Sequence, residues 1–75
     1  MLYIEICSPA HLTDDVLGLV KDDEAVSSVA VVRGASLKPV GDLVKIDVAR
    51  EAADDLISAV AQCARRRATR SRIRL

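Results

Sequence analysis

The chain has 75 residues, 51% of them hydrophobic, with a single aromatic side chain and a formal net charge of zero. A chain of this length forms one domain. Without Phe or Trp, its core must be thin and built from Val, Leu, Ile and Ala. A thin core favours an oligomer, in which a second copy buries additional surface. No apolar run approaches the roughly 18 residues of a membrane span, and residues 1–5 lack the basic start of a signal peptide. We therefore expect a soluble, cytoplasmic domain.

The zero net charge conceals two oppositely charged parts of the chain. Residues 1–64 contain eleven acidic and five basic side chains, whereas residues 65–75 contain six arginines and no acid. The sequence therefore predicts an acidic body with a basic tail. The two cysteines, Cys7 and Cys63, lie far apart in a chain without a secretion signal, so we expect reduced thiols and no disulfide.

The first third of the chain predicts a strand followed by a helix. Residues 2–7 alternate in the way typical of a half-buried strand, which places Ile4 and Ile6 on the buried face. Thr13 is a good N-cap, because its hydroxyl can accept a bond from a helix-start amide and two acids follow it, where the helix dipole favours them. Three consecutive acids at 22–24 oppose the helix dipole at a C-terminus, so the helix should stop near Asp22-Asp23.

The middle of the chain predicts a hairpin and a second helix. Residues 26–33 are rich in valine and indicate a second strand, residues 34–41 contain one proline and two glycines and indicate a turn, and residues 43–48 alternate as a third strand. Asp47 is predicted to cap the helix that follows. That helix carries one apolar stripe, formed by Ala49, Ala53, Leu56, Ile57, Val60 and Ala64.

The end of the chain completes the predicted fold. Residues 71–75 alternate, with arginines on one face, and predict a short fourth strand whose charge suits a sheet edge. The element order βαββαβ is that of an α+β, ferredoxin-like sandwich, an antiparallel sheet with two helices on one face. We expect a single domain over residues 1–75, with residues 65–75 as a basic tail or edge strand.

One stretch of the sequence is similar to a known family. Residues 41–56, and most specifically Asp47-Val48-Ala49-Arg50-Glu51-Ala52, resemble the N-terminal region of an uncharacterised family of bacterial and archaeal membrane proteins, known only as a numbered domain of unknown function. The similarity covers roughly residues 1–63. It implies a soluble α+β domain that precedes a bundle of hydrophobic helices, here detached from that bundle, and it implies no activity. Residues 65–75 depart from the family, because they lack a glycine turn before the last strand.

The loop between the second and third predicted strands is the candidate ligand site. Arg33 and Lys38 supply cations, and Gly34 and Gly41 permit close approach of a bound anion to the backbone. The spacing is not that of a phosphate-binding loop, so an ordinary hairpin loop is the stronger interpretation.

The residues typical of metal sites and of catalysis are sparse. Cys7 and His11 are four residues apart, but a structural zinc site usually needs four ligands and only Cys63 could add another soft one. No orienting group accompanies this Cys–His pair, as nucleophilic catalysis would require. We therefore expect no metal, no cofactor and no enzymatic activity.

The sheet face that the helices leave uncovered is the candidate interface. Tyr3, Leu43 and Lys45 should lie on it, and Glu5 should be able to pair with Lys45 across neighbouring strands. A mixed polar and apolar face suits a modest interface, so the leading hypothesis is a non-catalytic regulatory, ligand-sensing or oligomerisation domain, a homodimer, at the cytoplasmic N-terminus of a membrane protein. The alternative is a basic-tailed binder of nucleic acid or anionic lipid. With Tyr3 as the only aromatic side chain available to stack on bases, nucleic acid is the less favoured partner.

Overall fold

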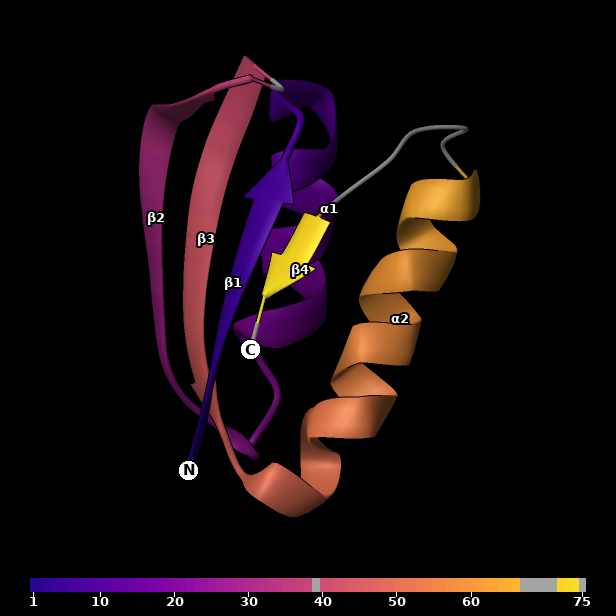
Figure 1. Cartoon of the computed structure of the whole chain (residues 1–75). Helices are drawn as coiled ribbons and strands as arrows, with labels where there is room; N and C mark the ends of the chain where they lie inside the picture. The colour runs from indigo at the N-terminus through magenta and orange to yellow at the C-terminus, as the bar shows by residue number, and fades with distance from the viewer. Residues whose placement is uncertain (39, 67–71, 75) are drawn as a thin grey trace.

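The prediction of an α+β fold is confirmed. The computed structural model describes residues 1–38, 40–66 and 72–74, and Figure 1 shows strands and helices in one layered body. The elements, in chain order, are β1 (Leu2–Ser8), α1 (Ala10–Val20), β2 (Val26–Leu37), β3 (Val40–Val48), the short 3₁₀ turn η1 (Arg50–Ala52), α2 (Ala53–Arg66) and β4 (Arg72–Arg74).

The strands form one antiparallel sheet with the order β2-β3-β1-β4. β1 and β3 are neighbours in the middle, where Ile4 lies opposite Ile46 and Glu5 lies opposite Lys45. β2 pairs with β3 as the predicted hairpin, and β4 pairs with β1. The outer strands in the described part of the chain are therefore β2 and the short β4, which comprises Arg72–Arg74 (Figure 1).

The core lies between one face of this sheet and the two helices. Because side chains alternate along a strand, β1 and β3 direct every second residue to that face. These residues pack in one cluster with the apolar stripes of both helices, and Leu12, Val16 and Val60 are fully buried in it. Of the predicted stripe, Ala53, Leu56, Val60 and Ala64 of α2 are buried, Ile57 is partly buried, and Ala49 lies before the helix. The full set of buried apolar side chains is Ile4, Ile6, Leu12, Val16, Val20, Val44, Ile46, Val48, Ala53, Leu56, Val60 and Ala64.

The predicted start of the first helix is wrong by one turn. α1 begins at Ala10, and Pro9 occupies the N-cap position with φ −56° and ψ 148°. The carbonyl of Pro9 accepts the amides of Leu12 and Thr13 at 2.9 and 3.2 Å, which closes the first turn. A proline suits this place because a helix start needs no bond from its missing N–H. Thr13 consequently lies inside the helix, fully buried.

The hairpin strands are longer than predicted, so the predicted turn over residues 34–41 is mostly strand. β2 runs on to Leu37 and β3 starts at Val40, with a register shift between Val32 and Ser36 that absorbs the extra residues. Pro39, the tail residues 67–71 and Leu75 lie outside the described residues.

Asp47 is also placed differently from the prediction. It belongs to β3, where it lies opposite Tyr3 of β1, and the pairing of the two strands continues one residue further, to Val48. The second helical segment therefore starts after Ala49, first as the 3₁₀ turn and then as α2.

Candidate functional site

The face of the sheet opposite the helices carries a defined set of side chains, which we call the open face. On β1 and β3 every second residue lies there, and all of these side chains are partly or largely exposed, with Tyr3 at 42%. The edge strand β2 adds Val32 at 45% exposure. On three of the strands, its members are Tyr3, Glu5 and Cys7 on β1, Leu43, Lys45 and Asp47 on β3, and Ser28, Ala30 and Val32 on β2. On β4, the register sets Arg74 opposite Glu5 and Arg72 opposite Cys7.

The strand register arranges the open face into rows of matched partners. Tyr3 lies opposite Asp47 and Glu5 lies opposite Lys45. In the third row, Cys7 lies opposite Leu43. Side chains directly opposite in an antiparallel pair have Cβ atoms about 4.5–5.5 Å apart. Each row on β1 and β3 therefore holds a chemically compatible pair: a hydroxyl with a carboxylate, an acid with an amine, and a thiol with an aliphatic group.

Two hydrogen bonds orient the polar groups of this face. The Tyr3 hydroxyl donates to Glu5 Oε1 at 2.9 Å, and the Ser28 hydroxyl donates to Asp47 Oδ2 at 3.2 Å. The bond to Glu5 raises the pKa of Tyr3 above its usual 10.0, and partial burial and the negative charges of Glu5 and Asp47 act in the same direction. Tyr3 is therefore a neutral hydrogen-bonding group at physiological pH. The predicted interface residues Tyr3, Leu43 and Lys45 are thus brought together on one face of two neighbouring strands.

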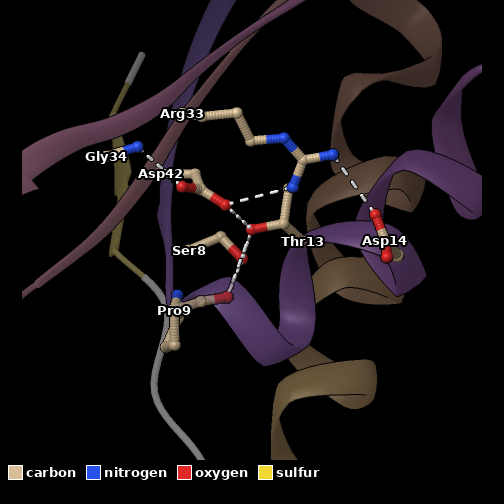
Figure 2. A network of polar contacts seen from close by, with 7 residues as sticks. All are labelled: Ser8, Pro9, Thr13, Asp14, Arg33, Gly34 and Asp42. Atoms are coloured by element: carbon tan, nitrogen blue, oxygen red, sulfur yellow. Dashed lines mark hydrogen bonds and ion pairs between the residues drawn. The ribbon is translucent and has the colours of Figure 1, made fainter.

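The predicted ligand loop has a different internal arrangement, centred on Asp42 (Figure 2). Asp42 is only 4% exposed. Its Oδ1 accepts the Gly34 amide at 2.8 Å, and its Oδ2 accepts the Thr13 hydroxyl at 2.7 Å and Arg33 Nη1 at 3.3 Å. Arg33 Nη2 also reaches Asp14 Oδ1 at 3.3 Å, so its guanidinium bridges two carboxylates.

These contacts hold Asp42 in its ionised form. The Thr13 hydroxyl bond is the main cause that lowers the pKa of Asp42 below its usual 3.8, followed by the Gly34 amide. Desolvation opposes this effect, and the charge of Arg33 reinforces it. The loop therefore already contains an anion, the carboxylate of Asp42. This carboxylate is bound by the Gly34 amide and the Arg33 guanidinium, two groups predicted from the sequence to bind an external anion.

The two glycines of the loop have backbone roles. Gly34 has a φ of 69°, in the left-handed region that side chains disfavour. Gly41 is buried against the end of β1, where a Cβ would lie 3.0 Å from the Ser8 carbonyl carbon and 3.2 Å from Pro9 Cα. Lys38 is exposed at the end of the hairpin. Of the predicted ligand residues, Arg33 and Gly34 converge on Asp42, whereas Lys38 and Gly41 do not. Binding of an external anion by Arg33, Gly34, Lys38 and Gly41 stays a prediction.

The sequence reasoning missed Asp42 and misplaced Thr13, although a signal for the pair was present. Thr13, Val16 and Val20 have the spacing of one helix face, so Thr13 is a hydroxyl on an otherwise apolar stripe. A buried hydroxyl requires a hydrogen-bond partner. The partner is 29 residues away on β3, and only the folded chain identifies it.

Other features of the described residues offer little chemistry. A hollow of about 330 Å³ lies between α1 and α2, lined by Asp15, Leu19, Ala59, Gln62, Cys63 and Arg66. Within residues 1–38, 40–66 and 72–74, no three His, Cys, Asp or Glu side chains are grouped as a metal site. Cys7 is half-buried on the open face, and His11 is exposed on α1. None of the helices in the described part of the chain has the length and apolarity to cross a membrane.

Comparisons with protein-family models, with curated proteins and with solved structures found no match. The similarity of residues 41–56 to a family of membrane proteins therefore stays a prediction. Within the described structure, the open face has the clearest pattern of matched side chains, in the rows of β1 and β3.

Proposed function

We propose that this chain is a non-catalytic assembly module with the ferredoxin-like βαββαβ arrangement, which forms a homodimer by stacking the open faces of two sheets. The element order and the strand order β2-β3-β1-β4 support the fold assignment. The observation that carries the function is the matched pairing of Tyr3 with Asp47 and of Glu5 with Lys45 in the central register.

This register makes the open face complementary to itself. A two-fold axis that runs parallel to the strands, midway between β1 and β3, places β1 of one copy over β3 of the other. Glu5 then faces Lys45 of the second copy, and Tyr3 faces Asp47 of the second copy. The operation also produces the reciprocal contacts, as an isologous interface requires. Every row of the two central strands meets its complement, and no like charges of these rows face each other.

The physical demand for such an interface comes from the composition. A small aliphatic core leaves a chain of this size marginally stable, and a second layer over the open face would remove Val32 and Leu43 from water. A standard interface covers about 800 Å² per partner, roughly a sixth of the 4878 Å² surface of this chain. Two stacked sheets lie about 10 Å apart, a distance that the side chains of both faces fill.

The resemblance of residues 47–52 to a membrane-protein family supports a setting for this dimer. We place the module at the cytoplasmic end of a longer membrane protein, where dimerisation would bring two membrane regions together and regulate them. The module itself performs no chemistry in this role.

The test uses contacts between isotopically labelled and unlabelled copies, measured by filtered nuclear Overhauser effects. In the natural chain, we expect intermolecular contacts from Leu43 methyls to Cys7 and from the Tyr3 ring to the strand that carries Asp47. A chain with Lys45→Glu is acidic at both positions of the central row, and a chain with Glu5→Lys is basic at both. Each alone should lose these contacts, because like charges then face each other across the two-fold axis.

Mixing the two variants distinguishes an interface from an effect within one copy. An equimolar mixture should regain the contacts, since every acid of one chain then faces a base of the other. Circular dichroism of each variant alone controls for folding. The absence of intermolecular contacts at the open face of the natural chain, or a mixture no better than its parts, would contradict the proposal.

The second candidate function rests on the exposed Arg65 and Arg66 at the C-terminal end of α2, which begin a run that would suit phosphates or anionic lipid. Replacing Arg65, Arg66, Arg67 and Arg70 by serine separates the two functions, because it leaves unchanged Arg72 and Arg74 of β4, which lie opposite Cys7 and Glu5. Binding to DNA, to RNA or to anionic vesicles should collapse in that variant and at high salt, whereas the open-face contacts should persist.

A further inference from the structure

The strand β2 forms one edge of the sheet, and Figure 1 shows it as the outermost element beside β3. One side of β2 pairs with β3 from Val26 to Leu37, with two register shifts, and in the described part of the chain no other strand pairs with its outer side. An edge of this kind offers a row of backbone donors and acceptors to another strand. At 12 residues, β2 is also the longest strand of the structure.

The usual protections of an edge strand are missing from the central part of β2. Residues 26–32 read VSSVAVV and contain neither a charged side chain nor a proline, the two features that most often prevent strands from pairing at an edge. Register shifts occur only at the two ends of this stretch, between Val26 and Ser28 and between Val32 and Ser36. Ser28 to Val32 is therefore a regular strand, and Val29 lies near its middle.

The charges at the two ends of β2 select the orientation of a second strand. The acids Asp22, Asp23 and Glu24 precede β2, and all are exposed. At the far end, Lys38 is exposed and positive, whereas Arg33 is already paired with Asp14 and Asp42 of its own chain. A parallel copy of β2 would set the three acids of one chain beside the three acids of the other. An antiparallel copy avoids this repulsion and brings the acids of each chain toward Lys38 of the other, so the charges favour the antiparallel orientation.

We propose that β2 pairs antiparallel with β2 of a second copy of this chain, about a two-fold axis that passes near Val29 perpendicular to the sheet. The product is one continuous sheet, in which Ser28 lies opposite Ala30 of the second copy. This interface is separate from the open face and does not depend on it. Because its axis is perpendicular to the open-face axis and displaced from it, the use of both interfaces together builds an open-ended array rather than a closed particle.

The experiment isolates the edge in the Lys45→Glu background, in which open-face stacking is opposed. Sedimentation equilibrium of this variant should still show dimers at high concentration, with filtered Overhauser contacts between Ser28 and Ala30 of different copies. Adding Asp22→Lys and Glu24→Lys places cations beside Lys38 of the other copy and should weaken the dimer by about tenfold. The matched control, Asp54→Lys with Asp55→Lys, makes the same change of charge on exposed positions of α2 and should leave the dimer within about twofold.

The two proposals fail in different ways. Edge contacts without open-face contacts in the natural chain would refute the stacking proposal alone. A Lys45→Glu chain that stays monomeric and shows no contacts between Ser28 and Ala30 would overturn the edge proposal, as would equal weakening by the control pair.

Discussion

The same substitution, glycine to alanine, should have three different effects on stability at three positions of this chain. At Gly41 a Cβ would approach the backbone of Ser8 and Pro9, with 3.0 Å to the Ser8 carbonyl carbon. Gly34 has open space around it but a φ of 69°. Gly18 lies in α1 with no atom within 4 Å of the added carbon. These environments determine the sign and size of each effect.

Gly41→Ala should be the most destabilising change. Overpacking commonly costs about 1–3 kcal/mol, and here the obstacle is backbone at the paired end of β1, where Ser8 lies opposite Asp42. We therefore expect a loss at the upper end, about 3 kcal/mol or more. Gly34→Ala should cost about 1–2 kcal/mol, the penalty of a left-handed residue with a side chain. Gly18→Ala should stabilise the protein by up to about 1 kcal/mol through helix propensity.

Urea unfolding followed by far-UV circular dichroism measures all three effects under the same conditions. For a domain of this size, 1 kcal/mol corresponds to roughly 4–8 °C in Tm, so thermal melts should rank the variants in the same order. The expected order rests on the backbone roles of Gly34 and Gly41 in the predicted ligand loop, where the Gly34 amide binds the chain's own Asp42. A Gly41→Ala chain as stable as the natural one, or a Gly18→Ala chain that is less stable, would refute it.

Of four further predictions, two concern the polar cluster, one the open face and one the core. Thr13→Val should lower the urea midpoint more than Thr13→Ser, because it removes the 2.7 Å bond to Asp42. Because the folded pKa of Asp42 is lowered, its contribution is present above pH 3.8 and is lost as the pH falls through the folded pKa; the stability difference between the natural chain and Asp42→Asn should therefore shrink in acid, and a constant difference would contradict this. Because the folded pKa of Tyr3 is raised, its contribution to stability is fully present below pH 10.0 and is lost as the pH rises through the folded pKa. Tyr3→Phe should therefore reduce the alkaline loss of stability in pH-dependent melts. Leu56→Ala should lower the free energy of unfolding by about 2–5 kcal/mol, measured by calorimetry, because the side chain of Leu56 on α2 is buried. A loss of stability under about 1 kcal/mol would place α2 outside the core.

The sequence predicted the order of the elements and the buried faces well, because both depend on local periodicity. Alternation placed Ile4 and Ile6 inside, and the helical stripe of α2 placed Leu56 and Val60 inside, as the structure confirms. The boundaries were predicted less well. Thr13 has the chemistry of a cap and Asp47 does too, but Pro9 starts α1 and strand pairing keeps Asp47 in β3.

The candidate site shows the same division. The membership of the open face followed from alternation, so Tyr3, Leu43 and Lys45 could be grouped from the sequence. Glu5 was predicted to pair with Lys45 if their strands are neighbours, and the structure shows that β1 and β3 are neighbours in this register. The sequence alone does not settle the register, because a shift of one residue between β1 and β3 would oppose different side chains. The role of Arg33 was also hidden, since its partners Asp14 and Asp42 lie on two other elements.

What the sequence determined by itself was the alternation of apolar and polar side chains, the division of charge between body and tail, and the amphipathic stripes, since each depends on residues close together in the chain. Only the tertiary structure decided which strands are neighbours, which carboxylate the Thr13 hydroxyl binds and which of the described strands lie at the edges of the sheet. These depend on contacts between distant segments, whose register is set by the packing of the whole core rather than by any one stretch of residues.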